Sequence, residues 1–103
     1  MDIGKMAREA GLRWPMAVSP AVWEIIQDIP PGSGQTIRGR VWDILWILSM
    51  LIRLRKAGAG DSVHFSVRMD RGSSRTRNLD LRAVIGPDGD AQDLLTLKLS
   101  EED

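Results

Sequence analysis

The chain contains no cysteine, no tyrosine, one phenylalanine and one histidine among its 103 residues. Without cysteine it can form no disulfide, no thiolate nucleophile and no Cys-ligated zinc site. No Ser–His–Asp arrangement or metal-ligand cluster can be drawn around its one histidine, His64, which belongs to an alternating polar and apolar segment. We therefore expect no enzymatic activity, and no catalytic, cofactor-binding or metal-binding residues.

Long hydrophobic runs are also scarce. The longest, in GRVWDILWILSMLIRLRK, extends from Val41 to Ile52 and is interrupted by Asp43. A membrane-spanning helix needs about 20 mostly apolar residues, and a charge near its middle is costly. The first eleven residues, MDIGKMAREAG, hold no apolar run of signal-peptide length. We expect a cytoplasmic protein with no membrane partner, in which this run forms a soluble helix.

Net charge is zero, but the charges are unevenly distributed. Residues 34–82 carry ten basic and four acidic side chains, whereas residues 83–103 carry one basic and six acidic. A neutral total with a basic middle and an acidic end favours a fold whose tail lies back over the basic region. A basic surface for nucleic acid is the less favoured interpretation.

Hydrophobic periodicity divides the chain into a helical half and a strand half. Caps and 3.6-residue spacing predict helices over residues 3–10, 20–29 and 36–56, with a short edge strand over residues 12–18. After Asp61 the period becomes two, which predicts three successive strands in SVHFSVRM, NLDLRAVI and LLTLKL. We predict a single α+β domain over residues 1–103. It consists of a three- or four-stranded antiparallel sheet, one long helix packed on its face and two short N-terminal helices.

The predicted long helix is apolar on more of its circumference than a sheet can cover. Its aliphatic arc suits the dry face of the sheet, while Trp42, Trp46, Met50 and Arg53 lie outside that arc. Exposed Trp and Met beside Arg is typical of interface cores. Either the two short helices cover this side, or it binds a second chain.

Two glycine-containing loops resemble ligand-binding motifs only faintly. PGSGQTIRGR lacks the lysine of a phosphate-binding loop, and GPDGDAQD lacks the glutamate of a calcium loop. The RMDRGSSRTR segment is the better candidate for binding because it gathers Arg68, Arg71, Arg75 and Arg77 around a predicted hairpin tip. No aromatic residue is interleaved for base stacking, so a solvated loop or a dock for the acidic tail is favoured over nucleic acid.

Three blocks of the sequence resemble an uncharacterised bacterial domain family. They are AREAGLRWPMAVSPAVW, GRVWDILWIL and IGPDGDAQDLLTLKLSEED. Members of that family are small proteins carried on plasmids, integrative elements and phages, and they begin with a further segment that is nearly lacking here. The resemblance implies a short-form accessory protein of a mobile element. It transfers no catalytic residues.

These observations favour a non-enzymatic protein-binding role. Small non-enzymatic proteins of mobile elements often bind and block host defence complexes. By this analogy the favoured function is inhibition of such a complex, as by an anti-CRISPR protein that binds a subunit of a CRISPR effector. The binding surface is predicted among Arg68, Arg71, Arg75, Arg77, Trp42, Trp46, Met50 and Arg53. A DNA- or RNA-binding regulator of the element and a homodimeric structural protein are the alternatives.

Overall fold

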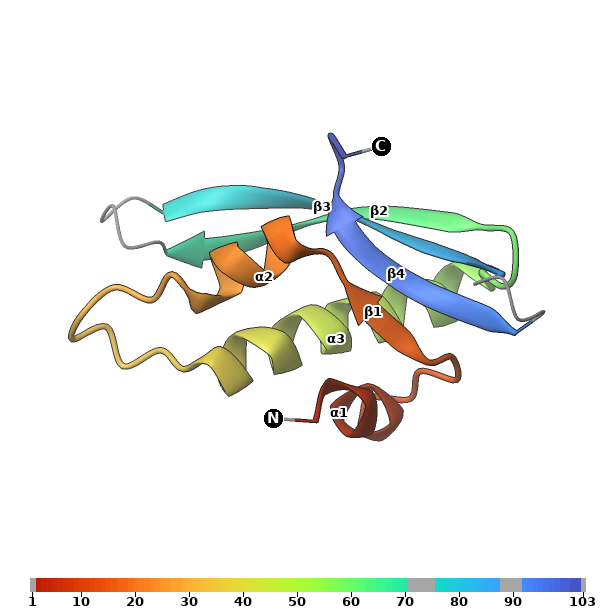
Figure 1. The fold of residues 1–103 in the computed structure, drawn as a ribbon, viewed down its shortest axis with the longest axis horizontal. Coiled ribbons are helices and arrows are strands. Elements are labelled where there is room, and N and C mark those ends of the chain that lie inside the picture. The colour runs from red at the N-terminus through yellow and green to blue at the C-terminus, as the bar shows by residue number, and fades with distance from the viewer. Residues whose placement is uncertain (1, 71–75, 88–91, 103) are drawn as a thin grey trace.

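The residues that the structure describes form three helices and four strands in two layers. The computed structural model describes residues 2–70, 76–87 and 92–102. In Figure 1 the sheet lies on one side and the long helix α3 runs beneath it. The elements are α1 (Ile3–Glu9), β1 (Met16–Val18), α2 (Pro20–Gln27), α3 (Ile37–Arg55), β2 (Ser62–Asp70), β3 (Thr76–Pro87) and β4 (Asp93–Leu99). The predicted α+β class is confirmed.

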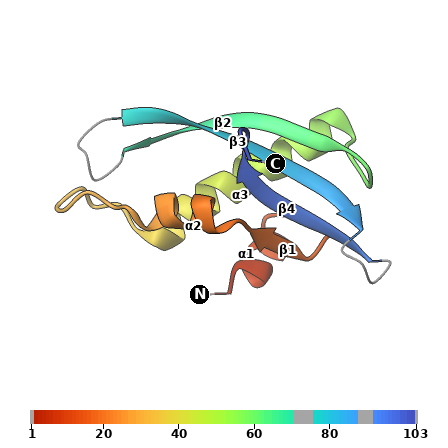
Figure 2. The same ribbon diagram turned by 45° about the horizontal axis from the view of Figure 1, so that its top comes forward.

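The sheet is mixed, with strand order β1-β4-β3-β2. Strands β2, β3 and β4 form the predicted antiparallel meander, but β1 pairs in parallel with β4, so the prediction of a fully antiparallel sheet was wrong. The chain leaves β1 through α2 and α3, enters the sheet at β2, the opposite edge, and returns by two reversals. The two reversals make β4 parallel to β2, and β1 lies beside β4 running in the same direction, as Figure 2 shows.

Hydrogen bonds extend the β1–β4 pairing at both ends of the short strand. The Leu95 amide donates to the Pro15 carbonyl at 2.9 Å, and the Ser19 amide donates to the Leu97 carbonyl at 2.9 Å. Pro15 has no amide proton to offer, which suits the edge position predicted for this segment. The strand ends at Val18 as predicted but begins at Met16 and not at Leu12, because the Leu12 amide closes the end of α1 by donating to the Ala7 carbonyl at 2.9 Å.

The helix starts follow the side chains that cap them. Asp2 accepts from the Lys5 amide at 2.9 Å, Ser19 from Val22 at 3.3 Å and Thr36 from Gly39 at 2.9 Å. Each hydroxyl or carboxylate thus satisfies one of the amides that a helix start leaves without an internal partner. These caps set the beginnings of α1, α2 and α3.

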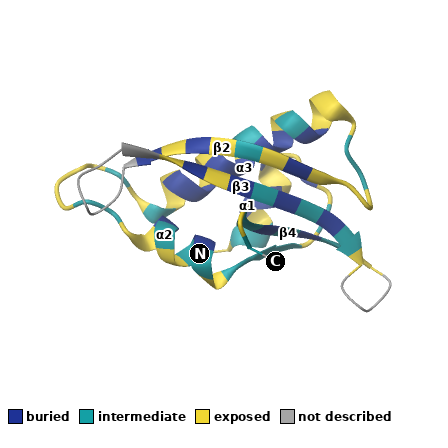
Figure 3. Cartoon of the chain, turned by 90° about the horizontal axis from the view of Figure 1, so that it is seen from above, coloured by how far each residue is buried: buried dark blue, intermediate teal, exposed yellow. Residues whose placement is uncertain are grey.

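One face of the sheet is dry. Alternate residues of β2, β3 and β4 are buried, as the banding along the strands in Figure 3 shows. On α3 the aliphatic arc of Val41, Ile44, Leu45, Leu48 and Ile52 joins the same core. An arc with spacings of three and four residues is the part of a helix that lies on a sheet.

A buried arginine joins the start of α3 to the end of α2. The Arg40 side chain is only 4% exposed, and its guanidinium donates to the carbonyls of Ile25, Ile26 and Asp28 at 3.0 to 3.2 Å. Its Nε donates to the side chain of Gln35 at 2.9 Å. The final carbonyls of a helix lack internal hydrogen-bond donors and carry partial negative charge. The Arg40 guanidinium supplies both the donors and a compensating positive charge.

Replacing Arg40 by methionine should therefore destabilise the fold. Arg40→Met keeps an unbranched apolar stem but leaves the α2 carbonyls without donors, at an expected cost of about 3 kcal/mol in the free energy of unfolding. Urea denaturation measures this cost. The exposed neighbour provides the control, since Arg38→Met should change stability by less than about 0.5 kcal/mol. Equal effects of the two substitutions would contradict the capping role.

Candidate protein-binding surface

The long helix α3 exposes a line of large apolar side chains. Trp42 is 37% exposed, Trp46 48%, Met50 41% and Leu54 77%. They are spaced four residues apart, which places them in a row along one side of the helix. Leu48, fully buried, lies at the middle of the opposite side. We call Trp42, Trp46, Met50 and Leu54 the exposed stripe.

The short helices of the chain do not cover this stripe. Helix α1 packs on the flank of α3 at Ser49, which is buried, and the ideal Cβ position of Gly11 lies 3.3 Å from the Ser49 hydroxyl. Helix α2 contacts α3 near its start, where Arg40 holds it. Neither helix reaches far enough around α3, so the alternative in which they bury the tryptophans was wrong.

Two charged residues flank the stripe on opposite sides. Asp43 and Arg53 are both exposed. At about 100° per residue they lie about 40° to either side of the stripe's centre, Asp43 towards the start of α3 and Arg53 towards its end. Asp43 is the only acidic residue of α3. The stripe therefore has a negative and a positive end, on opposite flanks.

The arginines of the predicted hairpin lie apart from this stripe. Arg68 is exposed on β2, where the alternating pattern places it on the polar face of the sheet, opposite the face that meets α3. Arg77 pairs with Met69 in the β2–β3 register, and its side chain is outside the described part of the structure. Arg71 and Arg75 lie outside the described residues. The predicted set thus divides between two surfaces.

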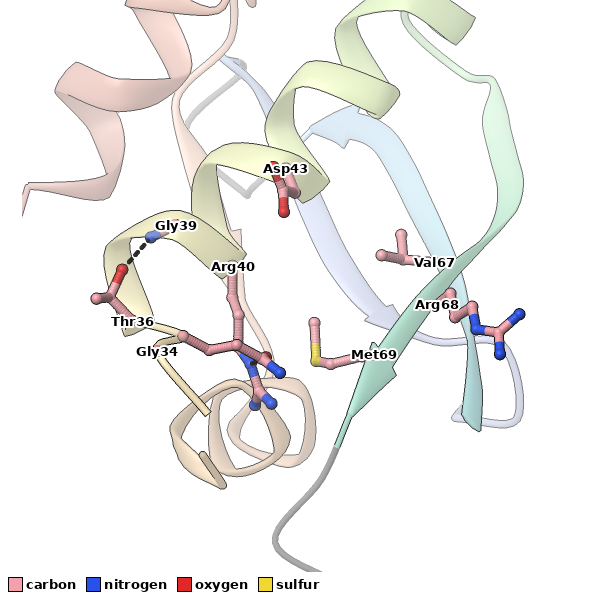
Figure 4. A pocket seen from close by; sticks show the side chains of 9 residues that line it. Gly34, Thr36, Gly39, Arg40, Asp43, Val67, Arg68 and Met69 are labelled. Atoms are coloured by element: carbon pink, nitrogen blue, oxygen red, sulfur yellow. Dashed lines mark hydrogen bonds between the residues drawn. The ribbon is translucent and has the colours of Figure 1, made fainter. Parts of the chain in front are cut away.

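A pocket opens between the start of α3 and β2, but its charged groups do not converge on a ligand. Figure 4 shows Val67 and Met69 pointing towards α3, whereas the Arg68 side chain points away on the other side of the strand. Arg40 lines the pocket with its guanidinium committed to α2. Of the other polar groups that line it, the Thr36 hydroxyl caps the helix, the Gln35 side chain accepts from Arg40, and Asp43 is a carboxylate. The pocket therefore lacks the convergent free donors that an anion site needs.

The acidic tail folds back against the sheet through Glu102. Its carboxylate accepts from the Ser19 hydroxyl at 2.8 Å and from the Leu99 amide at 3.3 Å. Its main-chain carbonyl accepts from the Arg82 guanidinium. This contact lies where α2 begins. A tail contact with the arginine hairpin falls outside what the structure describes.

The described residues contain neither a metal-ligand cluster nor a membrane-spanning helix. Over residues 2–70, 76–87 and 92–102, no three His, Asp or Glu side chains are grouped so that they could hold a metal ion. None of the helices in these ranges has the length and hydropathy required to cross a membrane. His64 is exposed, as its place on the polar face predicts.

Comparisons with protein-family models, with curated proteins and with solved structures returned no match. The stripe therefore has to be interpreted from its own geometry. The sequence identified Trp42, Trp46 and Met50 as candidate binding residues. Leu54 belongs to the same apolar side of the helix, which the sequence pattern left open to a second chain.

Substitutions in the exposed stripe should affect the free energy of unfolding much less than substitutions in the core. Trp46→Lys should change the free energy of unfolding by less than about 1 kcal/mol, because Trp46 is half exposed and lies away from the core. Leu45→Ala, one residue earlier, should cost about 3 kcal/mol because Leu45 is 1% exposed. Chemical denaturation compares the two. A larger loss for Trp46→Lys than for Leu45→Ala would show that the stripe belongs to the core.

Proposed function

We propose that this protein is a non-enzymatic protein-binding module that acts through the exposed stripe of α3. The observation that carries the proposal is the outward row of two tryptophans, a methionine and a leucine on a helix whose other side already covers the sheet. Contiguous apolar surface of this kind marks interaction sites in soluble proteins. Tryptophan is among the residues most enriched at the energetic hot spots of protein interfaces.

The proposed biological role is that of a mobile-element accessory protein that inhibits a host defence complex. It is supported by the resemblance of three sequence blocks to proteins carried on plasmids and phages, and by a binding surface that does not depend on a catalytic site. An inhibitor of this kind works by occupying a surface that the host complex needs. A subunit of a CRISPR effector is the leading target class.

The experiment is affinity capture from host extracts that contain defence complexes. The tagged wild-type protein should retain an effector subunit, and Trp46→Lys should lose it because a charge replaces the middle of the stripe. His64→Ala, on the opposite surface, is the matched control and should retain the subunit. If no subunit of any defence system is captured by the wild type, the inhibitory role fails.

Capture of nucleic acid would support the alternative regulatory role instead. That outcome requires binding that weakens steeply with salt, because phosphate contacts release counterions. It would also be insensitive to Trp46→Lys, since the exposed arginine Arg68 projects from the polar sheet face and not from the stripe.

A further inference from the structure

Another pocket lies beside the last turns of α3, next to the segment that joins α1 to β1. It has a volume of about 310 Å³, and its lining includes Arg13 and Trp14 from that segment and Ser49, Arg53 and Lys56 from the end of α3. We call it the basic pocket. We propose that the basic pocket is a binding site for a phosphate group, a function separate from the protein binding assigned to the exposed stripe.

Three positive charges line the basic pocket, and no acidic residue is among the described residues that line it. The charges come from two segments distant in sequence, because Arg13 precedes β1 whereas Arg53 and Lys56 lie at the end of α3. Basic residues at the end of a helix commonly offset its dipole, which accounts for Arg53 and Lys56 but not for Arg13. A cleft lined by charge of one sign attracts the opposite ion. The pocket therefore favours an anion.

The donors of these basic side chains are not committed to carboxylates. The guanidinium carbon of Arg13 lies 4.9 Å from the centre of the Trp14 ring. Stacking of this kind uses the face of the guanidinium and leaves the N–H groups in its plane available to acceptors. Within the described ranges, no acidic side chain pairs with Arg13, Arg53 or Lys56. The pocket thus holds the convergent donors that the pocket beside β2 lacks.

A buried hydroxyl at the inner end of the pocket gives independent support for a ligand. Ser49 is 1% exposed, and its hydroxyl has no hydrogen-bond partner among the described residues. A buried hydroxyl without a partner is unfavourable. Gly11 lines the pocket beside it, and a Cβ there would lie 3.3 Å from the hydroxyl oxygen. With no side chain at Gly11, a small shift of this turn lets an acceptor oxygen from the pocket reach Ser49.

Phosphate is the anion that matches these donors. A phosphate group carries a charge of about −1.5 to −2 near neutral pH and presents three strong acceptor oxygens in different directions. Arginine, lysine and serine side chains recur as phosphate ligands in proteins. The group enters either as the free ion or as the phosphate of an organic ester, whose remainder would lie against Trp14.

Titration of the purified protein with inorganic phosphate tests the site. At low ionic strength we expect a dissociation constant in about the millimolar range. Two-dimensional NMR should show shifts of the backbone amide signals of residues 11–14 and 53–57. A nucleoside monophosphate distinguishes the two sources of the group. Binding tighter than that of phosphate by about tenfold assigns the site to an ester, and equal binding assigns it to the free ion.

The Ser49→Ala variant separates a ligand contact from a structural role. It should weaken phosphate binding by about tenfold, because a hydrogen bond to a charged group is lost. Without phosphate its free energy of unfolding should not fall, since the hydroxyl that it removes has no partner in the free protein. Urea denaturation with and without phosphate measures both effects. A serine with only a structural role would show the reverse pattern.

Two neighbouring arginines provide a matched pair of variants. Arg53→Gln should weaken phosphate binding severalfold because Arg53 lines the pocket. Arg55→Gln is the control and should bind almost as tightly as the wild type, since Arg55 is exposed in the same last turn of α3 but is not part of the lining. Equal weakening by the two substitutions would indicate diffuse attraction to the basic end of α3 and would overturn the proposal.

The site is also disproved if the wild type shows no amide shifts in tens of millimolar phosphate, or if Ser49→Ala binds phosphate as tightly as the wild type. These measurements contain no host component. Their outcome is therefore independent of whether the exposed stripe captures a target, and failure of either proposal leaves the other to its own test.

Discussion

The packing of α3 against the dry face of the sheet is the contact on which the rest of the molecule depends. Leu48 lies at the middle of that contact and is completely buried. Once this arc of the helix is fixed, the direction of every other α3 side chain follows from the helical repeat. Ser49 then faces α1, Arg40 reaches α2, and Trp46 is left outward. The exposed stripe is thus the side of α3 that stays in solvent once the opposite side is packed in the core.

The two short helices are held at the flanks by different chemistry. Helix α1 approaches α3 closely because Gly11 and Ser49 are small where they meet. Helix α2 is held by a charge, since the Arg40 guanidinium replaces the donors that the end of a helix lacks. Neither contact requires either helix to extend across the outer side of α3. The outer side of α3 stays uncovered because α1 and α2 are each only about two turns long.

Local features of this fold could be predicted from the sequence, and its long-range geometry could not. Caps such as Ser19, the alternation along β2 and the aliphatic arc of α3 are properties of neighbouring residues. The parallel pairing of β1 with β4 depends on the path of the whole chain. The role of Arg40 depends on where α2 ends in space. For the binding surface, periodicity placed Trp42, Trp46 and Met50 outside the aliphatic arc of α3, but only the placed helices showed that these side chains face outward.

The pairing of the first strand with the last has a consequence for synthesis. Within the described residues β1 has no strand partner other than β4, which lies at the far end of the chain. Bringing such distant segments together has a large entropic cost and is slow. On the ribosome, β1 must wait for residues 93–99 to emerge before it can enter the sheet. Until then the dry face of the growing sheet is incomplete, so the nascent chain is most prone to aggregation before β4 joins the sheet.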